Sequence, residues 1–194
     1  MSAAANPALE RPRSEIEDLR AALGQFATGV AIVTTRAPDG RSVGLTVNSF
    51  ASVSLEPPLV LWSLSKRSSS LEAFRVAPSV AIHVLSAEQE ALARRFASPS
   101  ADRFAGLHRG IGPAGVPLLE GCVARFICTP YARTEAGDHL VFILRVERWA
   151  RAAGPALVFH AGRFCGMGQD AAPPAAPERG VDFTRAPRPG IVPH

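Results

Sequence analysis

The sequence has 194 residues, a formal net charge of +4 at pH 7, 47% apolar residues and 20% charged residues. This length and composition are typical of one globular domain with a hydrophobic core. No apolar run approaches the roughly 18 residues of a membrane-spanning helix, and residues 1–13 lack the apolar segment of a secretory signal, so we expect a cytoplasmic protein without a membrane partner.

The basic charge does not predict a protein that binds nucleic acid. Of the 21 basic residues only Lys66 is a lysine, and the arginines are scattered without a stripe of aromatic and basic residues. The three cysteines, Cys122, Cys128 and Cys165, have neither C-x-x-C nor metal-site spacing. We therefore expect reduced core cysteines and no metal site.

The first half of the chain predicts one helix followed by strands and two further helices. Ser14 and Glu17 have the spacing of a capping box, which starts a helix that ends near residues 24–29. A Pro-Asp-Gly turn occupies residues 38–40. The predicted strands are 30–35, 43–54, 59–64 and 80–85, and the two later helices are 68–76 and 87–96.

The second half predicts a long loop, a hairpin and a tail. Residues 98–118 are rich in glycine and proline, which is typical of a functional or mobile loop. The later elements are a hairpin of strands 121–133 and 139–149, and a last strand over 156–164. Many antiparallel strands with few short helices predict a mainly β protein, a β-barrel with helical decoration. We place one domain at 14–168, between a disordered arm (1–13) and a C-terminal extension rich in Pro, Ala and Arg (169–194).

The segment 44–58 carries a run of short polar side chains. Thr46, Asn48, Ser52 and Ser54 alternate on one face, interrupted by Phe50. Short side chains let a planar ligand approach the backbone, and their hydroxyl and amide groups can hydrogen-bond a polar ring edge. An outward face that meets water explains the same pattern equally well.

The segment 63–71 reads Ser-Leu-Ser-Lys-Arg-Ser-Ser-Ser-Leu and joins a strand to a predicted helix. Free backbone N–H groups, five hydroxyls and two basic side chains favour an anion such as a phosphate. The segment has no glycine framework and is not a Walker loop. A serine-rich helix cap with solvated basic residues is the alternative interpretation.

Two further segments hold histidine. His139 follows Asp138 at the start of a strand, and such a pair can form an oriented, partly protonated imidazole. His160-Ala161-Gly162-Arg163-Phe164 ends the last predicted strand, where an arginine near a glycine can clamp a phosphate or a ribose. Either segment alone is also compatible with a turn or a strand end. The sequence contains no serine-hydrolase elbow, H-E-x-x-H or G-x-G-x-x-G motif.

Taken in order, these segments resemble the flavin reductase-like, FMN-binding split-barrel family, the small reductase components of two-component flavin-dependent monooxygenases. The resemblance covers about residues 20–168. Its motifs are Gly24–Val30, Thr34-Thr35, Gly44–Phe50, Ser52-Val53-Ser54, Pro57-Pro58, Ser63–Ser70, Asp102–Gly106, Gly137-Asp138-His139 and His160–Phe164. The order of these motifs, rather than any one of them, carries the resemblance.

The resemblance implies a split β-barrel that forms a homodimer and binds flavin near the subunit interface. It implies an NAD(P)H-dependent reductase that transfers a hydride to FMN or FAD and supplies reduced flavin to a partner monooxygenase. His139 would face the nicotinamide as the catalytic-site histidine, and Arg103 would close over the site with Phe104. The implied cofactor-binding residues are Thr46, Val47, Asn48, Ser49, Ser52, Ser63, Leu64, Ser65, Lys66, Ser68, Ser69, Ser70, Phe104, Arg163 and Phe164.

Two alternatives remain open within the same fold. One is a flavin-binding oxidoreductase that acts directly on an organic substrate, and the other is a flavin-binding protein without catalytic activity. The sequence does not separate FMN from FAD, or NADH from NADPH.

Overall fold

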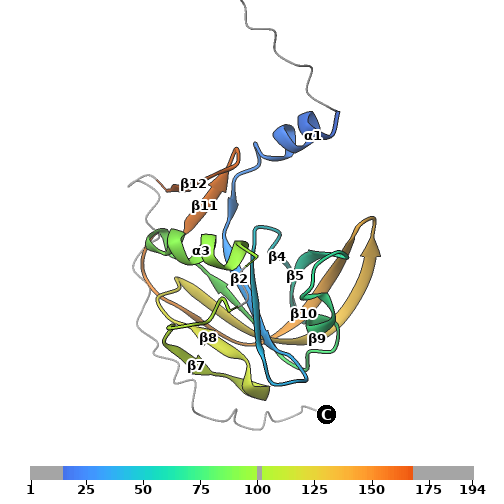
Figure 1. Cartoon of the computed structure of the whole chain (residues 1–194), viewed down its shortest axis with the longest axis vertical. Coiled ribbons are helices and arrows are strands. Elements are labelled where there is room, and N and C mark those ends of the chain that lie inside the picture. The colour runs from blue at the N-terminus through green and yellow to red at the C-terminus, as the bar shows by residue number, and fades with distance from the viewer. Residues whose placement is uncertain (1–14, 100–101, 168–194) are drawn as a thin grey trace, which may run out of the picture.

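The computed structural model describes residues 15–99 and 102–167, and the predicted arm and extension lie outside this range. The described part is mainly β, as expected, with three sheets (Figure 1). The largest sheet is antiparallel and contains, in spatial order, β3 (Ser42–Val47), β2 (Ala31–Arg36), β6 (Val80–Val84), β9 (Ala124–Ala136), β10 (His139–Arg151), β5 (Pro58–Ser65) and β4 (Ala51–Leu55).

Two small sheets and three α-helices complete the described fold. The small sheets are β1 (Thr28–Gly29), β11 (Leu157–His160) and β12 (Arg163–Gly166), and β7 (Arg109–Ile111) with β8 (Pro117–Leu119). The helices are α1 (Glu15–Leu23), α2 (Leu71–Arg75) and α3 (Glu90–Ala97), with 3₁₀ turns at Ala87–Gln89 and Pro113–Gly115. No helix in residues 15–99 or 102–167 has the length and hydrophobicity needed to span a bilayer.

The seven-stranded sheet is forced to curl, because β3 and β4 follow each other in the chain but lie at its opposite edges. Residues 48–50 alone connect them. The predicted single strand over 43–54 is therefore wrong, since the chain leaves one edge after Val47 and joins the other at Ala51. The two edges meet without a β-ladder between them among the described residues, which is the split barrel that the sequence motifs imply.

A side-chain hydroxyl takes the place of the missing ladder. Ser49 Oγ accepts a hydrogen bond from the Ser63 N–H at 3.0 Å and donates to the Ser63 carbonyl at 3.3 Å. β4 pairs with β5 only as far as Leu61, so the edge of β5 at Ser63 has no β4 residue opposite it. One hydroxyl thus satisfies both backbone groups that the end of β4 leaves open.

Two apolar clusters fix the barrel. Inside it, Trp62 stacks on Phe142 with ring centroids 4.7 Å apart and meets Phe74 edge-on at 4.9 Å. Outside it, Phe96 of α3 and Phe104 pack edge-on at 4.9 Å, in a cluster that β11 also joins. β2 is buried on both faces because it contributes side chains to both clusters.

Several predicted elements differ from the observed ones. Helix 68–76 shortens to the five residues of α2, because serine hydroxyls bond the backbone of the preceding turn. The predicted loop 98–118 contains β7 and the first two residues of β8, and Leu118 of β8 packs on Ala81 and Ile127. The hairpin loop predicted at 134–138 shortens to the two residues between β9 and β10.

The predicted last strand over 156–164 is a hairpin, β11 and β12. Ala161 has a φ of 47° and Gly162 a φ of 78°, and positive values at both central residues define the turn type that joins tightly paired antiparallel strands. A non-glycine residue at the first turn position hid this signal in the sequence. The cysteines are all free, but only Cys128 lies in a strand of the core, whereas Cys165 is exposed.

A buried histidine joins three strands. His83 of β6 places Nδ1 3.1 Å from the Ile32 carbonyl of β2, and its Nε2 accepts a hydrogen bond from the Leu119 N–H of β8 at 3.1 Å. The acceptor role of Nε2 requires a neutral ring with its proton on Nδ1. Burial lowers the pKa of His83 to about 3, because desolvation disfavours the charged form.

This histidine predicts a specific pH dependence of stability. In the unfolded chain His83 binds a proton below pH about 6.5, but in the folded chain it does so only near pH 3. The contribution of the neutral ring to the free energy of unfolding is therefore complete above pH 6.5 and is lost as the pH falls toward 3. Between these limits the free energy of unfolding falls by up to about 1.4 kcal/mol per pH unit from this group.

Urea unfolding between pH 7 and pH 4.5 measures the effect. The His83→Gln variant, whose amide can donate and accept without titrating, is expected to show a shallower slope than the wild type. His108→Gln changes an exposed histidine outside the core and is the control. Equal slopes for the wild type and His83→Gln would contradict the assignment of a neutral buried ring.

Candidate functional site

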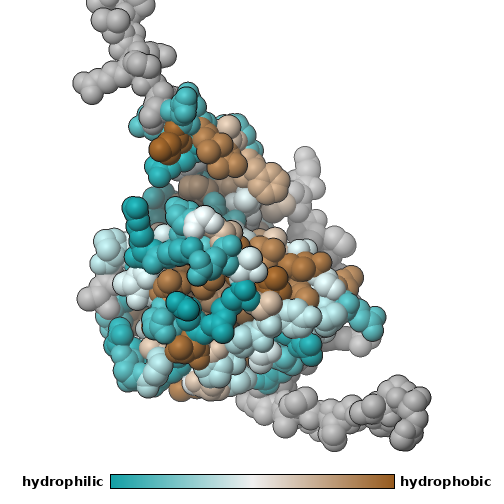
Figure 2. Space-filling view, turned by 90° about the vertical axis from the view of Figure 1, so that its right-hand side faces the viewer, coloured by the Kyte–Doolittle hydropathy of each residue, from teal (hydrophilic) through white to brown (hydrophobic). Residues whose placement is uncertain are grey.

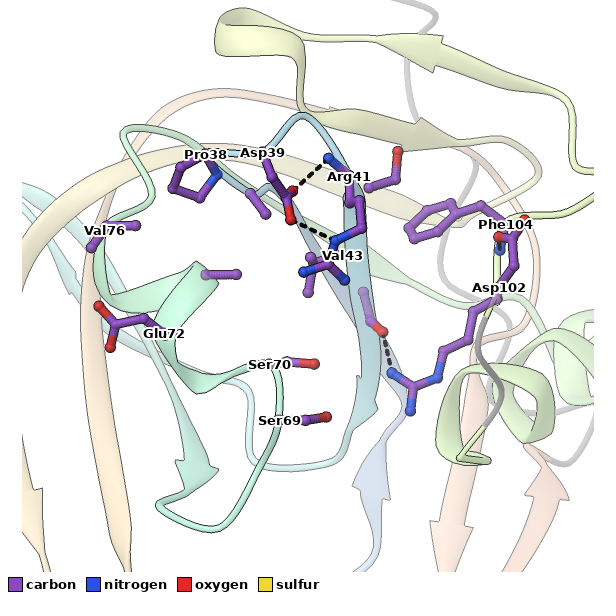
Figure 3. A pocket seen from close by; sticks show the side chains of 15 residues that line it. Pro38, Asp39, Arg41, Val43, Ser69, Ser70, Glu72, Val76, Asp102 and Phe104 are labelled. Atoms are coloured by element: carbon purple, nitrogen blue, oxygen red, sulfur yellow. Dashed lines mark hydrogen bonds and ion pairs between the residues drawn. The ribbon is translucent and has the colours of Figure 1, made fainter.

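A cleft of about 650 Å³ lies between the β2–β3 hairpin, the serine-rich turn with α2, and residues 102–104 (Figure 3). This volume is in the range of small-molecule and cofactor sites. The cleft is lined by Ala37, Pro38, Asp39, Arg41, Ser42, Val43, Gly44, Ser69, Ser70, Glu72, Ala73, Val76, Asp102, Arg103 and Phe104. Three of the residues predicted for cofactor binding, Ser69, Ser70 and Phe104, are among them.

The turn that precedes α2 separates its serines into two groups. Ser65 Oγ accepts from the Arg67 N–H at 3.3 Å, and Ser68 Oγ accepts from the Ser70 N–H at 3.2 Å, so these hydroxyls shape the turn. Ser69 and Ser70 line the cleft, and the Ser70 side chain makes no capping bond to α2. The hydroxyls that face the cleft are therefore the ones available to a ligand.

Lys66 lies at the start of this turn and points to the long β9–β10 arm. Its Nζ donates to Glu135 Oε2 at 2.9 Å, which lowers the pKa of Glu135, and its backbone N–H donates to the Asp138 carbonyl at 2.8 Å. Lys66 does not line the cleft. Lys66 therefore holds the serine-rich turn against the β9–β10 hairpin, and Glu135 neutralises the charge of its ammonium group.

His139 is the neighbour of this turn in the sheet. It begins β10, opposite Ser65 of β5, and its Nδ1 lies 2.7 Å from Asp138 Oδ1. The hydrogen bond with His139, together with the electrostatic interaction with that residue, lowers the pKa of Asp138. Since Nδ1 is held by Asp138, the ring is oriented and Nε2 is the nitrogen available to a ligand.

The residues predicted to surround a flavin ring gather where the barrel closes. Asn48 and Ser52 are exposed at the connection between β3 and β4. Ser63 precedes Ser65 by two residues on β5, so the two side chains lie on the same face of that strand. Ser49 bonds Ser63, as described above. Thr46 is tied to α3, because its Oγ1 donates to the Ala93 carbonyl at 2.7 Å.

Val47 and Leu64 differ from the other predicted ring residues, because both side chains are buried in the barrel core. Only their backbone can approach a ligand. The group around the closure does not line the cleft in a single chain. Gly44 is the last residue of β3 in the cleft wall, and Thr46 and Val47 follow it on the same strand.

Arg103 and Phe104 form the opposite wall of the cleft. Arg103 Nη1 donates to the Gly44 carbonyl at 2.8 Å and Nε donates to the Ser98 carbonyl at 2.9 Å, so Arg103 bridges Ser98 and β3. Asp102 Oδ1 accepts from the Phe104 N–H at 2.9 Å. The Phe104 ring is buried against Phe96 and is a fixed part of the wall.

Arg163 and Phe164 lie on β12, in the separate three-stranded sheet, and do not line the cleft. Phe164 packs on Phe159 with centroids 5.3 Å apart, and Arg94 lies over its ring at 4.9 Å. The Arg163 side chain is exposed. Their predicted role in cofactor binding stays a prediction.

Sequence reasoning missed the wall that the β2–β3 hairpin supplies. The Pro38-Asp39-Gly40 segment signals a turn, and nothing in it indicates a ligand. In the structure Asp39 accepts from the Arg41 backbone at 2.9 Å and side chain at 2.6 Å, and this pair forms one end of the cleft. Among the described residues, no group of three or more His, Cys, Asp or Glu side chains is placed to hold a metal ion.

The chain matches the family model of the flavin reductase like domain over residues 23–168. This match spans the barrel, the cleft and the three-stranded sheet, and the chain belongs to this family of flavin-dependent oxidoreductases.

Named relatives and solved structures agree with the family. The chain is 49% identical over 145 residues to the FMN reductase (NADH) SmoA of Agrobacterium fabrum, covering 75% of this chain and 82% of the relative. It is 43% identical to the reductase component of the flavin-dependent trigonelline monooxygenase of Acinetobacter baylyi over 78% of this chain, but spans only 49% of that longer protein.

A solved structure shares the architecture. The NADH:FAD oxidoreductase SgcE6 of Streptomyces globisporus, solved with NAD and FAD fragments, superposes with a TM-score of 0.77 at 38% identity, covering 81% of this chain and 95% of the other. At this identity and coverage the fold of the two chains is the same.

Gly44 provides a test of how tightly the cleft wall is packed. A Cβ added at Gly44 would lie 2.8 Å from Phe96 Cε1 and 3.0 Å from Phe104 Cζ, so we expect Gly44→Ala to lower the free energy of unfolding by about 1–3 kcal/mol. Gly29→Ala is the matched control, because a Cβ there meets nothing within 4 Å. Urea unfolding of both variants measures the difference, and equal stabilities would contradict the packed wall.

Proposed function

We propose that the protein is an NADH-dependent flavin reductase that supplies reduced flavin to a partner monooxygenase. The family match over residues 23–168 is the observation that carries this proposal. Relatives that are 36–49% identical are named as an FMN reductase (NADH), as flavin reductases and as reductase components of monooxygenases. Their names favour NADH over NADPH as the hydride donor.

The chemistry requires little reactivity from the protein. The flavin and the nicotinamide supply the hydride transfer, from which NAD⁺ and reduced flavin result. The chain must bind the flavin phosphate, leave space for two stacked rings and orient the nicotinamide. Ser69 and Ser70 offer hydroxyl donors at the cleft, and the short side chains of Asn48, Ser49, Ser52 and Ser63 leave the barrel closure open to a flat ring.

His139 would act as a positioning group for the nicotinamide. Asp138 holds its Nδ1, so Nε2 can hydrogen-bond a ligand at the Ser65 end of β5. Hydride transfer needs no acid at this place, and we therefore expect His139→Ala to raise the KM for NADH more than it lowers kcat.

Steady-state assays with each nicotinamide and each flavin test the proposal. We expect NADH oxidation that saturates with added free flavin, and slower oxidation of NADPH. A flavin that copurifies and never exchanges would instead favour an oxidoreductase that acts on an organic substrate. Flavin binding without NADH or NADPH oxidation would favour a binding protein without catalytic activity, and would overturn the proposal.

The serine hydroxyls predict the first specific variant. Ser69→Ala combined with Ser70→Ala removes two donors to the flavin phosphate, and we expect the KM for FMN to rise by about tenfold or more, since a hydrogen bond to a charged group contributes about 1.5–3 kcal/mol. The kcat at saturating FMN should change little. Thr134→Ala, which removes an exposed hydroxyl on β9, is the control. An unchanged KM in the double variant would refute the phosphate site.

A homodimer is the second part of the proposal. α1 projects from the body, and none of its residues is buried (Figure 1). Its apolar stripe is 65% exposed at Ile16, 59% at Leu19 and 66% at Leu23, and Phe26 beyond it is 78% exposed. In Figure 2, apolar side chains gather over α1 in the upper part of the view, and further apolar side chains lie on the body below. A nine-residue helix is marginal in water alone, so packing against a second copy would stabilise it.

This interpretation predicts that charges on the stripe weaken the dimer. Leu19→Glu with Leu23→Glu should raise the dimer dissociation constant by at least about 100-fold, because each chain would bring two carboxylates into the interface, where they would be desolvated. Analytical ultracentrifugation over a concentration series measures it. Arg20→Glu adds a carboxylate elsewhere on α1 and is the control. A dimer that both variants leave intact, or a monomeric wild type, would contradict this use of α1.

A further inference from the structure

Phe104 is held in the cleft wall by contacts to its ring and to both of its backbone polar groups. The ring is buried and packs edge-on against Phe96. The Phe104 N–H donates to Asp102 Oδ1 at 2.9 Å, and the Phe104 carbonyl accepts the N–H of Leu107 at 3.1 Å. These contacts give the wall a defined position at this residue.

Arg109 adds two further contacts to Phe104, although it does not line the cleft. It is the first residue of β7, and its Nη1 donates to the Phe104 carbonyl at 3.3 Å. The same guanidinium group lies over the Phe104 ring, 5.4 Å from the centroid, which is within the range of a cation–π contact. One side chain thus holds both the ring and the backbone of Phe104.

The β7–β8 pair anchors Arg109 to the buried part of the fold. Arg109 pairs with Leu119 of β8, and the Leu119 N–H donates to the buried Nε2 of His83 at 3.1 Å. Leu118 of the same strand belongs to a buried apolar cluster. A continuous set of contacts therefore leads from β6, through β8 and β7, to the cleft wall.

An arginine near a site for an anionic ligand acts either through its charge or through its contacts. Arg109 is exposed, and solvent ions screen an exposed charge within about 8 Å at physiological ionic strength. Its contacts with Phe104 act at short range and depend little on salt. The two contacts with one wall residue favour the second role.

We propose that Arg109 is a positioning residue of the reductase, which fixes Phe104 and thereby the width of the cleft. The inference rests on the proposed function, in which Ser69 and Ser70 bind the flavin phosphate across the cleft from Phe104 (Figure 3). Without the guanidinium group the ring still packs on Phe96, but the turn at residues 104–107 is held less firmly. The consequence is weaker flavin binding with unchanged hydride transfer.

Arg109→Met tests the proposal, because methionine retains an unbranched stem and removes the guanidinium group. We expect the KM for FMN to rise about fivefold or more, while kcat at saturating FMN changes less than about twofold, since displacement of a positioning group weakens ligand placement. Without ligand, hydrogen exchange at the Phe104 and Leu107 amides should be faster than in the wild type. Arg145→Met is the matched control, because Arg145 lies 5.6 Å over Tyr131 on the β9–β10 hairpin, and it should change neither readout.

Two further comparisons separate positioning from attraction by charge. At about 0.5 M NaCl, where the screening length is about 4 Å, the ratio of the two KM values should persist. In a Phe104→Leu background, Arg109→Met should change the KM for FMN less than it does in the wild type, because the two residues act together. A ratio that disappears at high salt, or an equal effect in both backgrounds, would overturn the proposal.

The outcome for Arg109 is distinguishable from the outcome for the reductase function. If the wild type oxidises neither NADH nor NADPH, the reductase function is refuted, and isothermal titration with FMN takes the place of the KM. A fivefold loss of FMN affinity in Arg109→Met would then still support the positioning role. Faster exchange with unchanged KM and affinity would make Arg109 a purely structural residue and would overturn the proposal, as would no change in any readout.

A second variant keeps the proposal testable if Arg109→Met does not fold. Arg109→Lys retains a charge and a donor but lacks the planar guanidinium group. It should show smaller changes in the same direction in the KM for FMN and in exchange at residues 104–107. Wild-type values of both readouts in this variant would contradict the need for a guanidinium group at this position.

Discussion

Paired hydrogen bonds between Ser49 and Ser63 join the two edges of the seven-stranded sheet, and this junction positions the candidate site. β3 and β4 are consecutive in the chain and lie at opposite edges of a seven-stranded sheet, so three residues must bring the edges together. A full ladder would close the barrel but would cover the backbone at this point. One hydroxyl satisfies both Ser63 groups and leaves the surface beside Asn48 and Ser52 open.

The same closure arranges the parts of the candidate site. It sets β3 across from β5, so the cleft wall at Gly44 and the serine-rich turn after Ser65 face each other. His139 is placed by its register with Ser65, and Phe104 by its packing on Phe96 against β3. The flavin ring and its phosphate are therefore proposed to follow one path from the barrel closure to the serine-rich turn.

Much of this fold could be predicted from the sequence, because the motifs have a fixed order and the strands have strong β patterns. The break between β3 and β4 at residues 48–50 could not be predicted, because the alternation of polar and apolar residues continues through it. Only the contact of Ser49 with Ser63 in the structure shows that the chain bends there. The β7–β8 pair was hidden because its support comes from Ala81 and Ile127, distant in the chain. The cleft wall at Asp39 and Arg41 was missed for a related reason: a turn sequence specifies local geometry and does not indicate which elements pack beside it.

The free energy of unfolding of Ser49→Ala tests the closure most directly. Alanine removes both hydrogen bonds to the partly buried Ser63 N–H and carbonyl, and a hydrogen bond contributes about 0.5–1.5 kcal/mol, so urea unfolding at pH 7 should show a loss of about 1–3 kcal/mol. Ser52→Ala, at an exposed position on the neighbouring strand, should change stability by less than about 0.5 kcal/mol. Equal stability of the two variants would contradict the claim that this hydroxyl closes the barrel.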